Sequence, residues 1–184
     1  MSLWISRWLG RWPVCIAFGV LATVMFAYLV PNAVAEVTAN RTLSPRILDE
    51  YYPTWTADDA RQLFAALGVN GRRAYQQFYL KLDFWFPVLS LSLFYAGLLS
   101  LAFPQGLRLA WLNLLAIPMY LSDVTENMNH FSMASSYPNL SALSLTIGPW
   151  LTLIKYFLIT ALPIIALLGF ATGWRQRGLG SDRS

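Results

Sequence analysis

Polar and ionisable side chains recur at helical spacing in an apolar part of the chain. Asp123, Asn127 and His130 stand at positions i, i+4 and i+7, so a helix places them on one face. Glu126 is adjacent to Asp123 on the same helix. Lys155 lies in the next apolar stretch, where a buried ammonium group needs an acidic partner. Ionisable groups inside apolar helices are costly and usually functional, so these residues are the first candidates for a site.

Three kinds of chemistry suit these residue types. Glu126 and His130 at i, i+4 could ligate a metal, with Asp123 or Asp83 completing the set. Asp123 or Glu126 could instead act as a general acid or base. A third interpretation is an ion pair with Lys155 that only fixes helix packing. Because the chain has one histidine and no repeat of the motif, we predict neither a metal nor another cofactor.

We therefore expect one polar cluster that binds a ligand or holds the helices together, and the sequence assigns no catalytic residue within it. The acidic partner of Lys155 is expected to be Asp123 or Asp83. The predicted members are Asp83, Asp123, Glu126, Asn127, His130 and Lys155.

The composition requires these residues to be positioned by apolar helices. The chain has 184 residues, of which 57% are hydrophobic and only 12% are charged. Soluble domains carry about 25% charged residues, so an ordinary water-soluble enzyme is excluded. One cysteine excludes a disulfide framework. The net charge of +4 is scattered along the chain, which argues against a nucleic-acid partner.

Four stretches are long and apolar enough to cross a bilayer, which takes about 20 residues in a helix. They lie at about 12–35, 80–103, 107–129 and 143–172. The predicted fold is therefore all-α: a single transmembrane domain, 1–184, built as a four-helix bundle in the inner (cytoplasmic) membrane. The loop before the last span has no Lys or Arg, whereas the C-terminal tail has three Arg. By the positive-inside rule we expect both termini in the cytoplasm.

An alternative at the N-terminus stays open. Arg7 and Arg11 precede an apolar core that ends near Ala33-Val34-Ala35, a pattern that also fits a secretory signal with its cleavage site. Cleavage would leave three spans. The apolar core is longer than that of a usual signal, which favours a retained span.

The long outer loop, 36–79, contains signals for an amphipathic helix at about 57–67. Thr56 and Asp59 have the spacing of a capping box, and Gly68 is placed to end the helix. Within the last span, Pro163 cannot donate to the carbonyl group of Ile159, which then needs another donor.

Three segments carry a resemblance to a group of bacterial four-span membrane proteins with no known activity. They are Gly71-Arg72-Arg73-Ala74-Tyr75, then Leu82-Asp83-Phe84-Trp85-Phe86-Pro87, and Asp123-Val124-Thr125-Glu126-Asn127. The resemblance covers the second to fourth spans. It implies a site that includes Asp83, Asp123, Glu126 and Asn127, and it implies no reaction.

The functional prediction is an integral membrane protein with a polar pocket that faces outward. This pocket would bind a membrane lipid or another amphiphile, or it would support a partner membrane protein. One alternative is a membrane enzyme that acts on a lipid or isoprenoid by carboxylate acid–base catalysis. The other is a purely structural accessory subunit of a membrane complex.

Overall fold

A computed structural model describes residues 8–38, 46–80, 87–103 and 109–178. Within these ranges all regular structure is helical, which confirms the predicted all-α class. The helices are α2 (Trp12–Val24), α3 (Val30–Thr38), α4 (Ala57–Phe78), α5 (Pro87–Ala102), α6 (Ala116–Ser136) and α7 (Ala142–Gly178). Three short elements join them: the π-helix η1 (Met25–Leu29) and the 3-10 helices η2 (Leu48–Glu50) and η4 (Ala110–Leu115).

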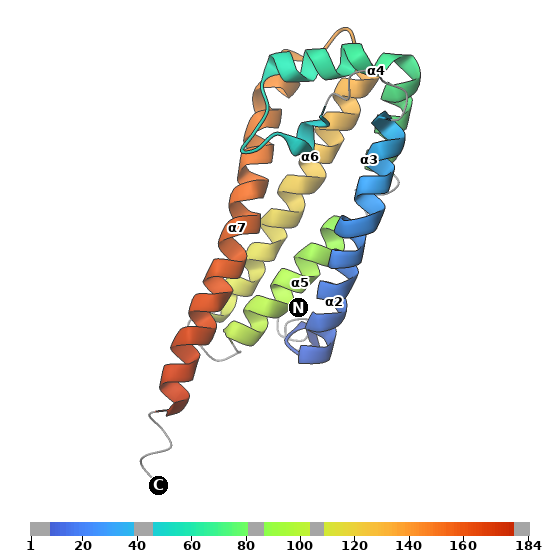
Figure 1. The fold of residues 1–184 in the computed structure, drawn as a ribbon. Helices are drawn as coiled ribbons and strands as arrows, with labels where there is room; N and C mark the ends of the chain where they lie inside the picture. The colour runs from blue at the N-terminus through green and yellow to red at the C-terminus, as the bar shows by residue number, and fades with distance from the viewer. Residues whose placement is uncertain (1–7, 39–45, 81–86, 104–108, 179–184) are drawn as a thin grey trace.

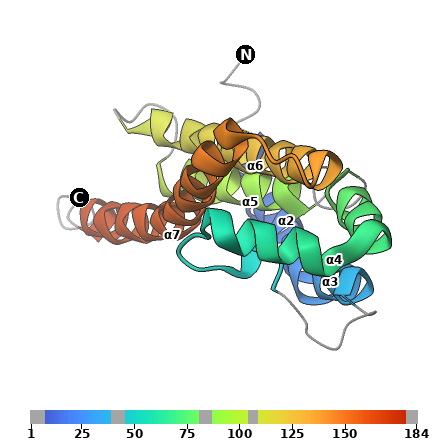
Figure 2. The same cartoon turned by 90° about the horizontal axis from the view of Figure 1, so that it is seen from above.

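The helices form an elongated bundle with a helical cap. Helices α2, η1 and α3 run on as one long rod, and α5, α6 and α7 lie alongside it (Figure 1). Helix α2 packs on α5, and α7 packs on both α5 and α6. Helix α4 lies across one end of the bundle, where it contacts α3 and α6 (Figure 2). The start of α2 and the end of α7 lie at the opposite end.

Two helical stretches are long and apolar enough to cross a membrane, Trp12–Ala35 and Ala142–Gly173. They indicate a membrane-associated protein. Helix α5 is apolar but shorter, and the segment just before it is outside the described residues. The third expected span differs most from the prediction: it begins as the 3-10 helix η4, and α6 continues to Ser136, beyond the expected end at 129.

The start of α4 follows its sequence signals. The Asp59 amide donates to Thr56 Oγ1 at 3.2 Å, and the Thr56 amide donates to the Asp59 carboxylate at 2.7 Å, which completes the expected capping box. Gly68 has a φ of 57°, the left-handed conformation expected at a helix end. The chain then turns and resumes a helix up to Phe78, and Arg72 donates to the carbonyl of Phe64 at 2.8 Å across the turn.

Pro163, one of the two prolines within α7, has the consequence that its position predicts. The Tyr95 hydroxyl on α5 donates to the carbonyl of Ile159 at 3.2 Å, so the group that Pro163 leaves unpaired finds a donor on a neighbouring helix. This bond helps to fix α5 against α7 at the level of the bend.

Two apolar cores hold the bundle, one at each end. The outer core lies under α4 and includes Trp55, Phe64 and Tyr75 with Met133 of α6. The inner core joins α5, α6 and α7 and includes Met119. The level between these two cores is where the site lies.

Candidate functional site

A buried polar layer separates the two apolar cores. Along α6, Met119 belongs to the inner core and Met133 to the outer core. Asp123, Glu126 and His130 lie between them, and all three are buried. Because the residues recur every three or four positions, one face of α6 changes from apolar to polar and back within four turns.

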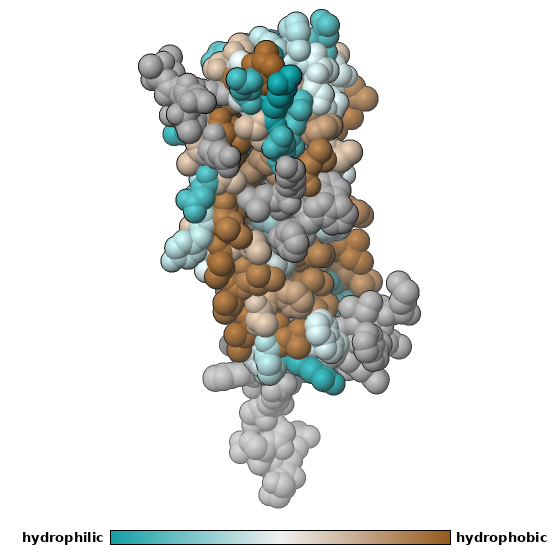
Figure 3. Space-filling view, turned by 90° about the vertical axis from the view of Figure 1, so that its right-hand side faces the viewer, coloured by the Kyte–Doolittle hydropathy of each residue, from teal (hydrophilic) through white to brown (hydrophobic). Residues whose placement is uncertain are grey.

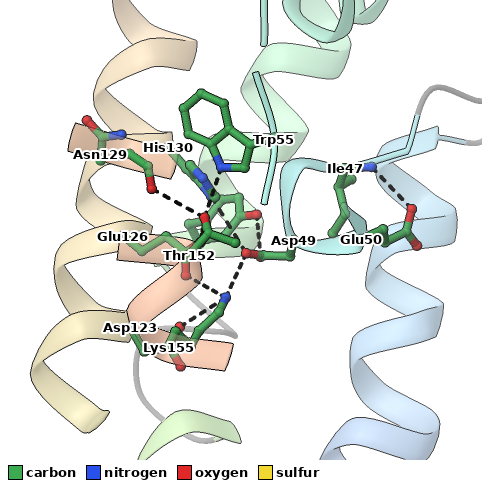
Figure 4. Close-up of polar contacts among 12 residues, drawn as sticks. Ile47, Asp49, Glu50, Trp55, Asp123, Glu126, Asn129, His130, Thr152 and Lys155 are labelled. Atoms are coloured by element: carbon green, nitrogen blue, oxygen red, sulfur yellow. Dashed lines mark hydrogen bonds and ion pairs between the residues drawn. The ribbon is translucent and has the colours of Figure 1, made fainter. Parts of the chain in front are cut away.

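Lys155 of α7 is the centre of the layer. Its Nζ lies 2.5 Å from Glu126 Oε2, 2.9 Å from Asp49 Oδ1 and 3.6 Å from Asp123 Oδ1 (Figure 4). Only 8% of the lysine side chain is exposed. A buried ammonium group with this many acidic partners is tightly held, and loss of any partner would leave uncompensated charge.

Asp49 is the member that sequence reasoning missed. It lies on the short helix η2, in the segment between α3 and α4 and outside the apolar stretches in which a buried ionisable group is expected. The Tyr79 hydroxyl donates to Asp49 Oδ2 at 2.6 Å, and the Tyr156 hydroxyl donates to the Asp49 carbonyl oxygen. The one available signal was an acidic residue directly after Ile47 and Leu48, a pair that turns out to be buried.

The surroundings of Asp49 keep its carboxylate ionised. Burial by itself would raise the pKa of Asp49. The Lys155 ammonium, the His130 ring and hydrogen bonds from Tyr79 and Lys155 outweigh burial and lower this pKa from 3.8 to about 2. Tyr75, which lies against Tyr79, shifts the other way: burial raises its pKa well above the usual range, so its phenol stays neutral.

His130 sits in a box of aromatic rings. The ring centroids of Trp55, Tyr75 and Tyr79 lie 5.8, 6.3 and 5.1 Å from that of His130. The imidazole is fully buried, and neither ring nitrogen has a hydrogen-bond partner among the described residues. Its Nδ1 lies 4.0 Å from Asp49 Oδ1. The imidazole ring therefore faces the Asp49 carboxylate without forming a hydrogen bond to it.

A hydrogen-bonded chain joins the outer core to the layer. Trp55 Nε1 donates to Thr152 Oγ1 at 2.9 Å, and the Thr152 hydroxyl donates to the Glu126 carboxylate. Trp55 is thus a buried part of the site, although it lies before α4 and outside the predicted spans. Gly148 makes room for the indole, because a Cβ atom there would lie 2.4 Å from Trp55 Cζ2.

The structure brings together four of the six predicted residues: Asp123, Glu126, His130 and Lys155. The expected pair of Lys155 and Asp123 is present, yet Asp49 and Glu126 lie closer to the ammonium group. Asn127 is buried on α6, but its amide atoms have no hydrogen-bond partner in the described part of the chain. Asp83 lies outside the described residues.

A cavity of about 730 Å³ reaches the layer from the side. Its walls are mainly apolar and come from the α2–α3 rod, α5 and α7, with Phe26, Leu91 and Ile159 among them. Asp49, Asp123 and Lys155 line its polar part, together with Tyr156. This volume falls in the range of small-molecule sites, about 300–1,000 Å³.

Nothing matches this chain among protein-family models, curated proteins or solved structures. What the site can do therefore follows from its own chemistry. Three carboxylates and one ammonium group, partly accessible from an apolar cavity, can hold a polar or cationic group and can exchange protons with it.

Proposed function

We propose that the protein is a multi-pass inner-membrane protein that binds an amphiphile in the cavity. The observation that carries this proposal is the meeting of an apolar cavity with buried charges. Walls such as Leu91 and Ile159 suit an alkyl or isoprenoid tail, and Asp49, Asp123 and Lys155 suit its polar head. A cavity that is apolar along its length and charged at one place favours molecules with an apolar tail and a polar head.

The surface supports insertion in a bilayer. Of the most apolar 18 residues of Trp12–Ala35 only 11% are buried, and of those of Ala142–Gly173 only 22% are buried. The core helix of a soluble protein, in contrast, is mostly buried. Large apolar side chains such as Ile16, Phe157 and Leu167 are exposed instead. On the face seen in Figure 3, hydrophobic residues predominate in the middle and lower parts, away from α4. Patches of this extent are rare on soluble monomers.

In the proposed topology the chain crosses the membrane four times, at 12–35, 80–103, 107–129 and 143–172. Helix α7 has 37 residues and reaches about 55 Å, more than the hydrocarbon core of about 30 Å. The start of α2 and the end of α7 share one end of the molecule, which fits an even number of spans with both termini in the cytoplasm. Helix α4 and the polar layer then lie toward the outer side.

The charges favour a head group that donates hydrogen bonds. Among the described residues, three carboxylates lie around the Lys155 ammonium group, so acceptor oxygens outnumber donors in this part of the layer. A hydroxyl or amine head fits this excess better than a phosphate, which would meet like charge.

Native mass spectrometry of the gently extracted protein tests the proposal. We expect the wild-type chain to retain a bound amphiphile. Leu91→Trp fills the cavity and should abolish binding of the amphiphile. Leu89→Trp on the same helix is the matched control, because Leu89 is 40% exposed and does not line the cavity. Equal retention of the amphiphile by both variants would place binding elsewhere and contradict the proposal.

A further inference from the structure

We propose that Asp49, Glu126 and His130 form a binding site for a divalent metal ion of the Zn²⁺ or Mn²⁺ type. The inference goes beyond amphiphile binding and depends in part on other residues, since Asp49 lines the cavity but neither Glu126 nor His130 does. One imidazole nitrogen with two carboxylates is a donor set that suits ions between the hard Mg²⁺ and the soft Cu⁺.

The donor atoms are close enough to share one ion. One ligand atom from each of the three residues lies within 4.8 Å of the other two. Ligands of a tetrahedral Zn²⁺ ion, each at about 2.1 Å from the metal, stand about 3.4 Å apart. The donor atoms would therefore have to approach one another by up to about 1.4 Å to share one ion, a distance that rotation of the side chains can supply.

His130 supplies the independent sign of a missing partner. Its ring is fully buried and aimed at Asp49, yet neither nitrogen is hydrogen-bonded within the described ranges. A buried polar group without a partner is costly, and a metal bond would satisfy it. Burial also favours the neutral imidazole, which is the form that binds metals.

The charges of the layer call for more cation than Lys155 provides. Among the described residues, Asp49 and Glu126 share a single ammonium group, so Lys155 offsets the charge of only one of these two carboxylates. A divalent ion at this position would supply further positive charge. Because a buried excess charge is unfavourable, the layer must take up either protons or such an ion.

The lysine and the metal ion would share ligands. Lys155 Nζ lies 2.9 Å from Asp49 Oδ1 and 2.5 Å from Glu126 Oε2, so its ammonium group occupies the cation position between the two carboxylates. Metal binding therefore requires the ammonium group to withdraw toward Asp123. This competition predicts that removal of the lysine charge strengthens metal binding, which a purely structural cluster would not show.

The experiment uses the untagged full-length chain in detergent, stripped with a chelator and dialysed against Zn²⁺, with Mn²⁺ as a paramagnetic probe. Metal per chain is measured by elemental analysis, and Mn²⁺ by electron paramagnetic resonance. We expect about one ion per wild-type chain, and an affinity lower by at least about tenfold in His130→Asn and Glu126→Gln. Asp58→Asn is the matched control, because Asp58 is an exposed carboxylate on α4 and should bind as wild type.

The Lys155→Met variant distinguishes an effect on metal binding from a failure to fold. In chelator this variant should melt below the wild-type protein, and Zn²⁺ should raise its melting temperature more than that of the wild type. Its affinity should increase by about tenfold or more. Two results would overturn the metal site: metal content far below one per wild-type chain with no thermal shift, or binding that His130→Asn and Glu126→Gln leave unchanged. Neither result bears on the amphiphile, whose retention is read separately with Leu91→Trp.

Discussion

Lys155 is the residue on which the polar layer depends. Its replacement by methionine leaves three carboxylates without their cation, so in the absence of metal we expect a loss of about 3–5 kcal/mol in the free energy of unfolding. Chemical denaturation in detergent measures this loss. Arg61→Met is the control: the ion pair of Arg61 with Asp58 is exposed, and such pairs contribute about 0–1 kcal/mol.

The double variant Lys155→Met with Glu126→Gln distinguishes a functional cluster from a simple lock. It still contains Asp49 and Asp123, so we expect it to recover only part of the stability lost in Lys155→Met. Full recovery would mean that the pair serves only to hold α6 against α7, as in the structural alternative.

Asp49 makes stability depend on pH in the acid range. Its pKa is about 2 in the folded protein and 3.8 when unperturbed, so its contribution is fully present above pH 3.8 and is lost as the pH falls toward 2. The contribution is about 2 kcal/mol. The melting temperature should therefore fall across this window in the wild type and fall less in Asp49→Asn. Parallel curves for the two proteins would contradict the ion pair.

At the residue scale, the sequence predicts which residues share one face of a helix. It does not predict contacts between residues that lie far apart in the chain. Asp123, Glu126 and His130 were predictable because i, i+3, i+4 and i+7 spacing fixes their common side on α6. Asp49 lies more than seventy positions before any of them, in a loop with no periodic pattern. Only the packing of η2 against Tyr79 and Tyr156 brings it to Lys155.

At the scale of single elements, Gly148 controls where α7 meets the outer segment. A Cβ atom there would approach Trp55 Cζ2 to 2.4 Å and Asn129 Nδ2 to 2.5 Å. Trp55 is rigid and 1% exposed, so it cannot move aside without displacing Thr152 from its hydrogen bond. We expect Gly148→Ala to cost about 1–3 kcal/mol through overpacking, measured by thermal and chemical unfolding. Gly173→Ala, with no atom within 4 Å of the added carbon, should cause no loss of stability.

Local signals predicted the starts and bends of elements better than their extents. The capping box at Thr56, the turn at Gly68 and the free carbonyl of Ile159 each follow from a few neighbouring residues. The extent of the π-helical segment η1 does not follow from local signals of this kind.

At the scale of the whole molecule, the proposed topology predicts which sites water-soluble reagents reach. In a Cys15→Ala background, Asp58→Cys on α4 should react with an impermeant maleimide in intact cells. Ser2→Cys and Ser184→Cys should react only after the inner membrane is opened. Labelling is read by the mass shift of the chain. Reaction of Ser184→Cys in intact cells would contradict four spans with cytoplasmic termini.

The all-α class follows from composition and hydropathy, since long apolar runs with few charges leave helices as the main solution. Composition and hydropathy predict the number of spans less clearly. The third expected span contains the polar residues of the site, and these residues lower its mean hydropathy. It also begins as a 3-10 helix. Within the described residues, only the first and last of the four expected spans form helices long and apolar enough to cross a membrane.

The place of Lys155 on the final helix sets an order for biosynthesis. The ribosome makes Asp49, Asp123 and Glu126 first, and their partner cation arrives only with α7. In the proposed topology α6 then presents two acids to the translocon, and an aspartate at the centre of a helix opposes insertion by about 2.5–3.5 kcal/mol. In this topology, entry of α6 into the lipid is coupled to the synthesis of α7, which supplies Lys155.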